Sequence, residues 1–173
     1  MIARRDILGS GLIGAAALAG GARAATEATG PRLELALEII ADIAPVQDLG
    51  SGPLGTRRIV PILGGTFEAK GSLAAGLKGV VLPGGADRQL IRTDGVRQLS
   101  ALYELRADNG DVITVLNKVL VEDKAGGRYA FSTPEITAPK GPSDWLNHHV
   151  FLGTLDSLKP ARSAVLIRFY RVY

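Results

Sequence analysis

Residues 96–121 read VRQLSALYELRADNGDVITVLNKVLV, and this stretch decides the fold. Apolar and polar residues alternate over Val96–Arg106 and again over Asp111–Val121, which is the period of a half-buried β-strand. Between the two runs stands Asp108-Asn109-Gly110, whose residue types tolerate positive φ and favour a tight turn. The stretch therefore predicts an antiparallel hairpin of two long strands.

The same alternation continues on both sides of this hairpin. It predicts strands over residues 33–39, 59–67, 77–82, 87–92, 129–137, 145–155 and 164–172, and no helix. Thr93-Asp94-Gly95 predicts a second hairpin, Pro83-Gly84-Gly85 a sharp corner, and residues 50–55 a loop. Glycines inside several strands supply the bends that barrel corners require. We expect an all-β fold, a single antiparallel β-barrel of about nine to ten strands.

The first 24 residues have the layout of an export signal. Arg4-Arg5 forms a basic start, residues 7–20 form an apolar run, and Ala22-Arg23-Ala24 offers small residues for cleavage. The run is shorter than the roughly 20 apolar residues of a membrane-spanning helix, so we expect no permanent membrane anchor. The arginine pair with the hydrophobic residues after it favours a twin-arginine (Tat) signal over an ordinary secretory one.

This signal sets the expected organisation of the chain. We predict a twin-arginine signal peptide over residues 1–24, a linker over 25–32 and one β-barrel domain over 33–173. The Tat export machinery is then a partner of the precursor, and the mature protein is periplasmic or secreted.

Cleavage after Ala24 also changes the charge balance. The whole chain has 20 basic and 17 acidic residues, and removal of residues 1–24 leaves 17 and 16, a net charge of +1. Nucleic-acid binding normally needs a basic face that neutralises phosphates, so we expect no nucleic-acid partner. The absence of cysteine excludes thiol nucleophiles, iron–sulfur clusters and cysteine-based zinc sites.

Polar residues that share a face with apolar ones are the candidates for a site. Alternation places Tyr103 with Leu99 and Leu105, and it places Asn117 with apolar residues of the following strand. Asp87 and Gln89 share one face in the same way. A carboxylate in an apolar pocket has a raised pKa and can act as a general acid or base near neutral pH. The alternative role for Asp87 is to bond backbone amides of the preceding glycine corner.

Residues 145–149, WLNHH, form the densest polar and aromatic cluster. Neighbouring residues on a strand point to opposite faces, so His148 and His149 cannot both reach one metal ion, and we expect no metal site. Trp145 and Asn147 would share a face and could stack on and hydrogen-bond to an aromatic ligand, or pack in the core. Tyr129 could likewise contact an aromatic ligand or pack in the core. Nucleophile-elbow, phosphate-loop and dinucleotide motifs are absent from the sequence, so no cofactor is expected.

Several blocks of the sequence carry a resemblance to a known family. They are RIVPILGGTF at 58–67, VLPGGAD at 81–87, RTDGV at 92–96, YEL at 103–105, NG at 109–110 and WLN at 145–147. In this order, over residues 33–173, they resemble the motifs of the domain-of-unknown-function 3237 family, also called uncharacterised protein family 0311. The resemblance implies a lipocalin-like barrel, an association with isomerisation or cyclisation of phenolic compounds, and site positions at Arg58, Asp87, Asn117, Trp145 and Asn147.

Two functional hypotheses follow from these observations. In the first, the protein is a cofactor-independent isomerase, cyclase or lyase acting on a phenolic or other apolar small molecule, with Asp87 as acid or base and Tyr103 and Asn117 orienting the substrate. In the second, it is a non-catalytic periplasmic carrier. The ligand-binding residues in either case would be Arg58, Gln89, Tyr129, Trp145 and Asn147, and a homo-oligomer is left open.

Overall fold

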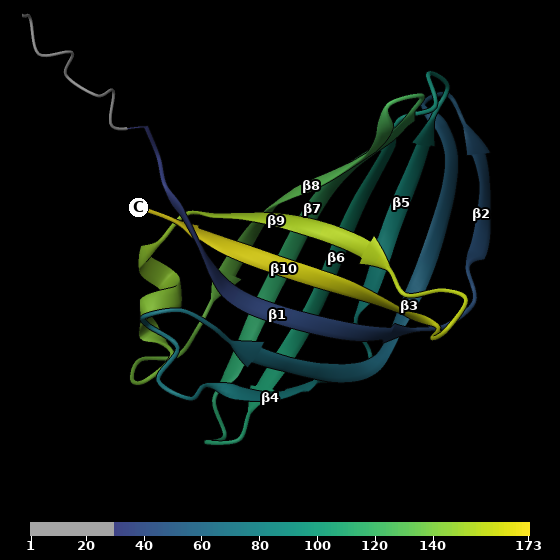
Figure 1. Ribbon diagram of the computed structural model, residues 1–173. Helices are drawn as coiled ribbons and strands as arrows, with labels where there is room; N and C mark the ends of the chain where they lie inside the picture. Colours follow the sequence, from purple (N-terminus) through teal and green to yellow (C-terminus); the bar gives the residue numbers. More distant parts are fainter. Residues whose placement is uncertain (1–29) are drawn as a thin grey trace, which may run out of the picture. The chain divides into compact units, whose positions relative to one another are not determined.

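A computed structural model describes residues 30–173, of which Pro31–Tyr173 form one compact unit. The predicted signal peptide and most of the predicted linker lie outside the described residues. The unit contains ten strands and one 3-10 helix (Figure 1). In chain order these are β1 (Leu33–Ile43), β2 (Gln47–Gly52), β3 (Gly55–Ala69), β4 (Lys78–Val81), β5 (Ala86–Arg92), β6 (Arg97–Ala107), β7 (Val112–Lys124), β8 (Gly127–Thr137), η1 (Asp144–His148), β9 (Phe151–Ser157) and β10 (Ala164–Val172).

Pairing between neighbouring strands closes the sheet into an antiparallel barrel. The order runs β1-β10-β9-β8-β7-β6, and β4 and β5 then both connect β6 to β3, which pairs back with β1. The circuit therefore has eight strand positions, and β2 extends β3 on the same side as β1. The predicted all-β, antiparallel β-barrel fold is confirmed. The hairpin quoted first is β6–β7, with Arg97–Arg106 paired to Val112–Val121.

The seam between β8 and β9 is the shortest pairing in the circuit. Only Phe131 with Thr154 and Ser132 with Gly153 are in register there. A Cβ on Gly153 would lie 2.2 Å from the Ser132 hydroxyl oxygen and 2.9 Å from the Phe169 ring, so the seam closes only because this residue has no side chain. Beyond it the strands separate, and the Arg128 guanidinium donates a hydrogen bond across the gap to the Leu155 carbonyl at 3.2 Å.

The two ends of the barrel differ. The apolar core lies toward one end, where Leu146 of η1 is buried beside Leu37, Leu105 and Phe169. The turns of the β2–β3, β5–β6 and β7–β8 hairpins gather at the other end (Figure 1). We call these the closed end, covered by η1, and the open end.

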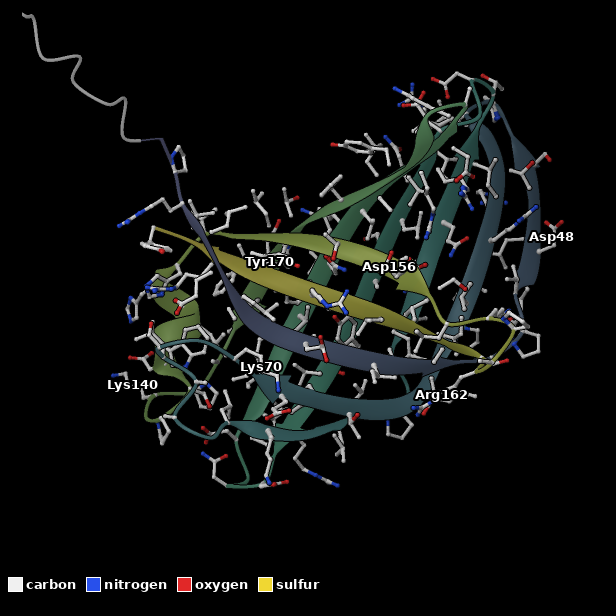
Figure 2. The ribbon with its side chains drawn as sticks, viewed as in Figure 1. Asp48, Lys70, Lys140, Asp156, Arg162 and Tyr170 are labelled. Carbon is white, nitrogen blue, oxygen red and sulfur yellow. The ribbon has the colours of Figure 1, made fainter. Side chains whose placement is uncertain are left out.

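Charged side chains lie on the outer surface of β1, β9 and β10, where Asp156 is labelled, and Arg162 is labelled in the loop between β9 and β10 (Figure 2). Arg162 donates two hydrogen bonds to the Asp42 carboxylate, at 2.7 and 2.8 Å. Arg168 contacts Glu38 at 3.0 Å and Asp156 at 3.6 Å. Inward apolar and outward charged residues thus alternate along these strands as the period of a half-buried strand requires.

Two predicted segments were wrong. Residues 50–55, predicted as a loop, belong to the ends of β2 and β3, with only Pro53 and Leu54 between the strands. Residues 145–155, predicted as a strand, begin with η1, and β9 starts only at Phe151. Within the described residues, the structure contains no helix long and apolar enough to cross a membrane.

Candidate functional site

A cavity of about 270 Å³ lies inside the open end of the barrel. Its walls differ in character. Strands β1, β9 and β10 contribute mainly apolar residues, among them Ala41, Leu155 and Ile167, whereas most of the polar ones lie on β3, β5, β6 and β7. The polar residues on these four strands are Arg58, Asp87, Gln89, Arg97, Tyr103 and Asn117. A mainly apolar pocket with a few convergent polar groups is the usual form of a small-molecule site.

The strand register brings Asp87 and Asn117 to the same level of the barrel. Asp87 on β5 is opposite Ala101 on β6, and Ala101 is opposite Asn117 on β7. Neighbouring strands lie about 4.8 Å apart, so roughly 10 Å separates the two backbones across Ala101. The small methyl group between them leaves room for a ligand. Tyr103 follows two residues later on β6 and points to the same side.

Several polar atoms of this cluster have no hydrogen-bond partner among the described residues. They are Asp87 Oδ1, the Tyr103 hydroxyl and both side-chain amide atoms of Asn117, all inaccessible to solvent. The other Asp87 oxygen, Oδ2, accepts a hydrogen bond from Gln89 Nε2 at 2.6 Å. An unpaired buried polar group costs about 1–3 kcal/mol, and each one in a native structure calls for an explanation. A ligand with complementary polar groups supplies one.

Burial also changes the acidity of the cluster. Desolvation raises the pKa of the Asp87 carboxyl above its usual value, and the hydrogen bond from Gln89 opposes this shift. Desolvation likewise raises the pKa of the Tyr103 phenol, and the neighbouring Asp87 charge adds to the effect. Asp87 can therefore hold a proton at a higher pH than an exposed aspartate does, while Tyr103 stays a neutral donor. The predicted alternative, Asp87 bonding the backbone of the glycine corner, is not what the structure shows.

Among residues 30–173, four cationic side chains and one carboxylate line the cavity. The cations are Arg58, Arg97, Arg128 and Lys159, and the carboxylate is Asp87. Arg97, Arg128 and Lys159 were not among the residues predicted from the sequence. Arg97 is an even number of residues from the inward Leu99 and Tyr103, and Arg128 is two residues from the buried Ala130. Strand alternation could therefore have predicted that both arginines point inward. Lys159 lies in the loop after β9, where no periodicity exists to place it.

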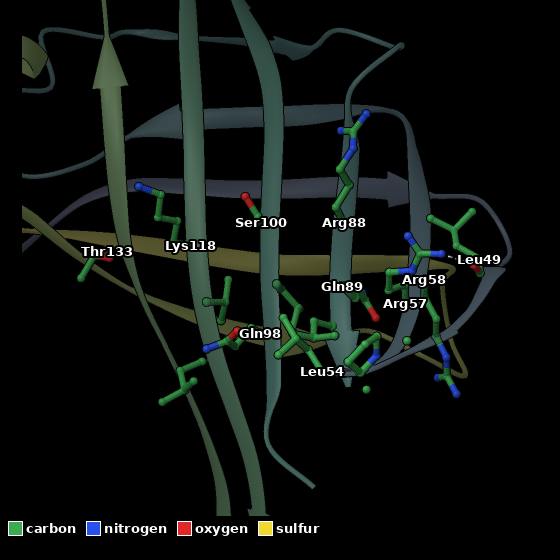
Figure 3. Close-up of a pocket in the computed structure, with 17 residues that line it drawn as sticks. Leu49, Leu54, Arg57, Arg58, Arg88, Gln89, Gln98, Ser100, Lys118 and Thr133 are labelled. Carbon is green, nitrogen blue, oxygen red and sulfur yellow. Dashed lines mark hydrogen bonds between the residues drawn. The ribbon is translucent and has the colours of Figure 1, made fainter. Parts of the chain in front are cut away.

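A second hollow lies on the outer surface under the β2–β3 hairpin. It is an open groove of about 1090 Å³ that shares Arg58 and Gln89 with the cavity. Arg88 on β5, Ser100 on β6, Lys118 on β7 and Thr133 on β8 lie along it (Figure 3). Lys118 is paired with Glu135 at 2.5 Å. In the part of the chain that the structure describes, no carboxylate lines the groove, and none of the unpartnered polar atoms belongs to its lining.

The structure brings five of the eight predicted site residues together. These are Arg58, Asp87, Gln89, Tyr103 and Asn117, which all line the cavity. The other three do not line it, and we remove them from the candidate site. Tyr129 is 44% exposed on the outer face of β8, with its ring centroid 4.9 Å from that of Phe131. Trp145 and Asn147 lie in η1 at the closed end.

The position of η1 explains the roles of Trp145 and Asn147. The Asn147 side chain accepts a hydrogen bond from the Ala138 amide and donates to the Ala138 carbonyl and to Asp144 Oδ1, each at 2.9 Å. Its polar group is thus fully used in anchoring η1 to the end of β8. Trp145 packs against the core near Phe151, at a ring-centroid distance of 6.2 Å. On a 3-10 turn, residues two apart do not share a face, so the pairing predicted from a strand was wrong.

His148 and His149 also belong to this turn and its end. His148 lies 3.4 Å from Asp144, and His149 is bonded to the Trp145 carbonyl at 2.7 Å. Residues 30–173 contain no group of three or more His, Cys, Asp or Glu side chains placed to hold a metal ion.

Comparisons with known proteins agree with the fold and place the chain among relatives. The family model described as protein of unknown function (DUF3237) matches residues 31–172. A UPF0311 protein of Rhodopseudomonas palustris (strain TIE-1) is 35% identical over 130 residues, which are 67% of this chain and 82% of the relative. The crystal structure of a β-barrel-like protein from Acinetobacter baumannii has a TM-score of 0.73 at 29% identity, covering 83% of this chain and 97% of the other.

A more distant structure is described as an enzyme from Penicillium herquei. Its TM-score is 0.65 at 18% identity, over 84% of this chain and 96% of the other. At that identity the likeness shows a shared fold.

Proposed function

This chain belongs to the DUF3237 family, and we propose that it binds a small, largely apolar, phenolic molecule in the open end of the barrel and catalyses a cofactor-free proton transfer on it. One observation carries the proposal. Asp87, Tyr103 and Asn117 present buried polar atoms without partners to one apolar cavity. A barrel that needed only a packed core would fill these positions with apolar side chains.

The size of the cavity limits the ligand. A cavity of about 150 Å³ is enough to hold benzene, so about 270 Å³ accommodates a single ring with one or two small substituents. The apolar wall of β1, β9 and β10 would contact one face of the ring. The polar wall would contact its substituents.

In the proposed reaction, Asp87 takes a proton from one atom of the substrate and returns it to another. A raised pKa brings the carboxyl closer to the working pH, where a general acid–base group is most effective. Asn117 would donate a hydrogen bond to the oxygen on which charge develops, and the Tyr103 hydroxyl would orient the substrate. The proton is conserved over the cycle, which is the balance of an isomerisation or cyclisation; a lyase would release a second product.

The comparisons support an enzyme at the level of analogy only, since one protein that shares the fold is described as an enzyme. The resemblance noted in the sequence associates the family with phenolic compounds. A carrier without chemistry would use the same cavity, and an experiment has to separate the two functions.

Deuterium exchange provides that experiment. The protein is incubated in D₂O with 4-hydroxyacetophenone, a single-ring phenol with exchangeable protons beside its carbonyl, and exchange is followed by NMR. We expect exchange above the buffer rate, and we expect Asp87→Asn to lower it about a hundredfold or more while the probe still binds. Asp156→Asn, on the outer surface, is the matched control. Binding of the probe with a buffer-level exchange rate in the wild type would identify a carrier.

We also propose that the mature barrel works outside the cytoplasm after export by the Tat route. The support is the arginine pair at Arg4-Arg5 and the apolar run that follows it. A fusion of residues 1–30 to a reporter should be exported, and changing both arginines to lysine should block its export. Unchanged export of the Arg4→Lys, Arg5→Lys fusion would contradict the proposal.

A further inference from the structure

The mouth of the cavity carries more positive charge than the nearby carboxylates neutralise. Arg97 contacts Asp123 at 2.5 Å, and Arg128 contacts the same carboxylate at 3.9 Å. Asp123 is 66% exposed at its side chain and does not line the cavity. Among the described residues, Arg58 and Lys159 form no ion pair. One carboxylate at the mouth therefore serves two arginines. Arg58 and Lys159 lie beyond ion-pair distance of any carboxylate of the described residues, although Asp48 of β2 is opposite Arg58 in the strand register.

This imbalance is local, because the mature chain as a whole has a net charge of only +1 by sequence. Cations gathered around a pocket with apolar, low-dielectric walls focus a positive potential into it. Keeping like charges close together costs free energy unless an anion offsets them. The mouth of the cavity thus has the electrostatic character of an anion-binding site.

By strand register, Arg58 is closer to the buried cluster than Arg97 is. It is opposite Gln89 on β5, two residues from Asp87, and so lies about 6.6 Å from the level of Asp87 at roughly 3.3 Å per residue. That separation is comparable to the length of one aromatic ring with its substituents. Arg97 is opposite Ile91, one further step toward the mouth.

We propose that the ligand is a small aromatic acid whose carboxylate binds Arg58 at the mouth, with Arg97 and Lys159 adding to the positive field, while its ring extends inward to Asp87 and Asn117. This inference rests on the cavity of the proposed function and names the class of its ligand. Arginine suits the task because its planar guanidinium binds a carboxylate through two parallel hydrogen bonds. Arg128 has a structural task as well, since it bridges β8 and β9.

Two probes that share the phenol ring and differ in the charge of the group opposite the hydroxyl test the inference. They are 4-hydroxybenzoate, an anion, and 4-hydroxybenzyl alcohol, which is neutral. Calorimetric titration of the mature protein at low ionic strength should give a dissociation constant about tenfold to a hundredfold lower for the benzoate. The difference should shrink as salt is added, because the mouth is open to solvent.

Variants then assign the preference to the mouth. Arg58→Met combined with Arg97→Met keeps most of the apolar stems but removes two charges, and it should bring the two dissociation constants within about threefold of each other. The dissociation constant of the benzoate should rise by more than that of the alcohol. Arg106→Met is the matched control, because Arg106 is an exposed arginine of β6 that lines neither hollow. Circular dichroism of each variant confirms that the barrel is folded.

The outcomes separate this inference from the proposed function. Equal binding of the two probes by the wild type, or a preference for the benzoate that survives in the double variant, would overturn the anionic ligand and leave the phenol-binding cavity standing. Binding of neither probe at millimolar concentration would overturn both. A preference for the benzoate that the wild type and Arg106→Met show and the double variant lacks supports both the anionic ligand and the phenol-binding cavity.

Discussion

Asn147 lies at the closed end of the barrel and Asn117 inside the open end. The same type of side chain differs in burial and in hydrogen bonding between the two places. Asn147 is exposed, yet its amide makes three hydrogen bonds of 2.9 Å that anchor η1. Asn117 is 1% exposed, yet neither of its side-chain amide atoms has a hydrogen-bond partner within residues 30–173. Asn147 thus uses its polar atoms within the fold. Asn117 keeps its polar atoms available to a ligand in the cavity.

The comparison predicts opposite effects on stability when each asparagine is replaced by leucine, a residue of similar size without polar atoms. Asn147→Leu should lower the free energy of unfolding by about 1–2 kcal/mol, because three hydrogen bonds to η1 and β8 are lost. Asn117→Leu should raise it by about 1–3 kcal/mol, because a buried amide without partners is removed. Urea unfolding of both variants measures the difference, and destabilisation of equal size in both would break the comparison.

Replacing Tyr103 should also stabilise the protein, by a smaller amount than replacing Asn117. Its hydroxyl is fully buried and has no partner, so Tyr103→Phe should raise the free energy of unfolding by about 1 kcal/mol. The same variant should exchange deuterium into 4-hydroxyacetophenone more slowly than the wild type. A stabilised variant with undiminished exchange would show that this hydroxyl has no part in the chemistry.

Asp87 gives the smallest expected effect, and it appears as a dependence on pH. Burial raises the pKa of Asp87 in the folded state, so the folded protein binds this proton more tightly than the unfolded chain does. The stability that this group contributes is full below the unfolded value of 3.8 and is lost as the pH rises through the folded pKa. Asp87→Asn should therefore be more stable than the wild type at neutral pH, with the advantage fading toward acid.

Asp94 supplies a control of opposite sign for this measurement. The Val96 backbone amide, and then the Arg92 guanidinium, lower the pKa of Asp94. Its contribution is present above the unfolded pKa and is lost as the pH falls through the folded one. Urea midpoints of Asp87→Asn and Asp94→Asn, each compared with the wild type between acid and neutral pH, would show the two opposite trends. Parallel trends would contradict the burial of Asp87.

Much of the fold could be predicted from the sequence, because strand alternation is a direct consequence of burial on one face. Alternation predicted the β6–β7 hairpin and the inward positions of Tyr103 and Asn117. The family membership that we inferred from blocks of the sequence is also confirmed. Alternation failed at residues 145–149, because one 3-10 turn is too short to show a period of its own. It failed at β2 as well, because Gly50, Ser51 and Gly52 resemble a loop although they continue the strand.

The candidate site was predictable only in part, for a related reason. Alternation says which side chains point inward, but it does not say which of them find partners there. The sequence offered both Asn147 and Asn117 as site residues. The position of Asn147 in η1, and its hydrogen bonds to Ala138 and Asp144, separate it from Asn117 in the cavity. Lys159 reaches the cavity from a loop, and a loop has no period from which its direction could be inferred.

The most direct test of the account follows both asparagines in one spectrum. The mature protein labelled with ¹⁵N is titrated with 4-hydroxybenzoate, and the side-chain amide signals of Asn117 and Asn147 are assigned through their leucine variants. The account predicts that the Asn117 signals shift with the concentration of the ligand, whereas those of Asn147 stay in place. Shifts at Asn147 with none at Asn117 would contradict it, since the ligand would then bind at the closed end and the open cavity would not be the site.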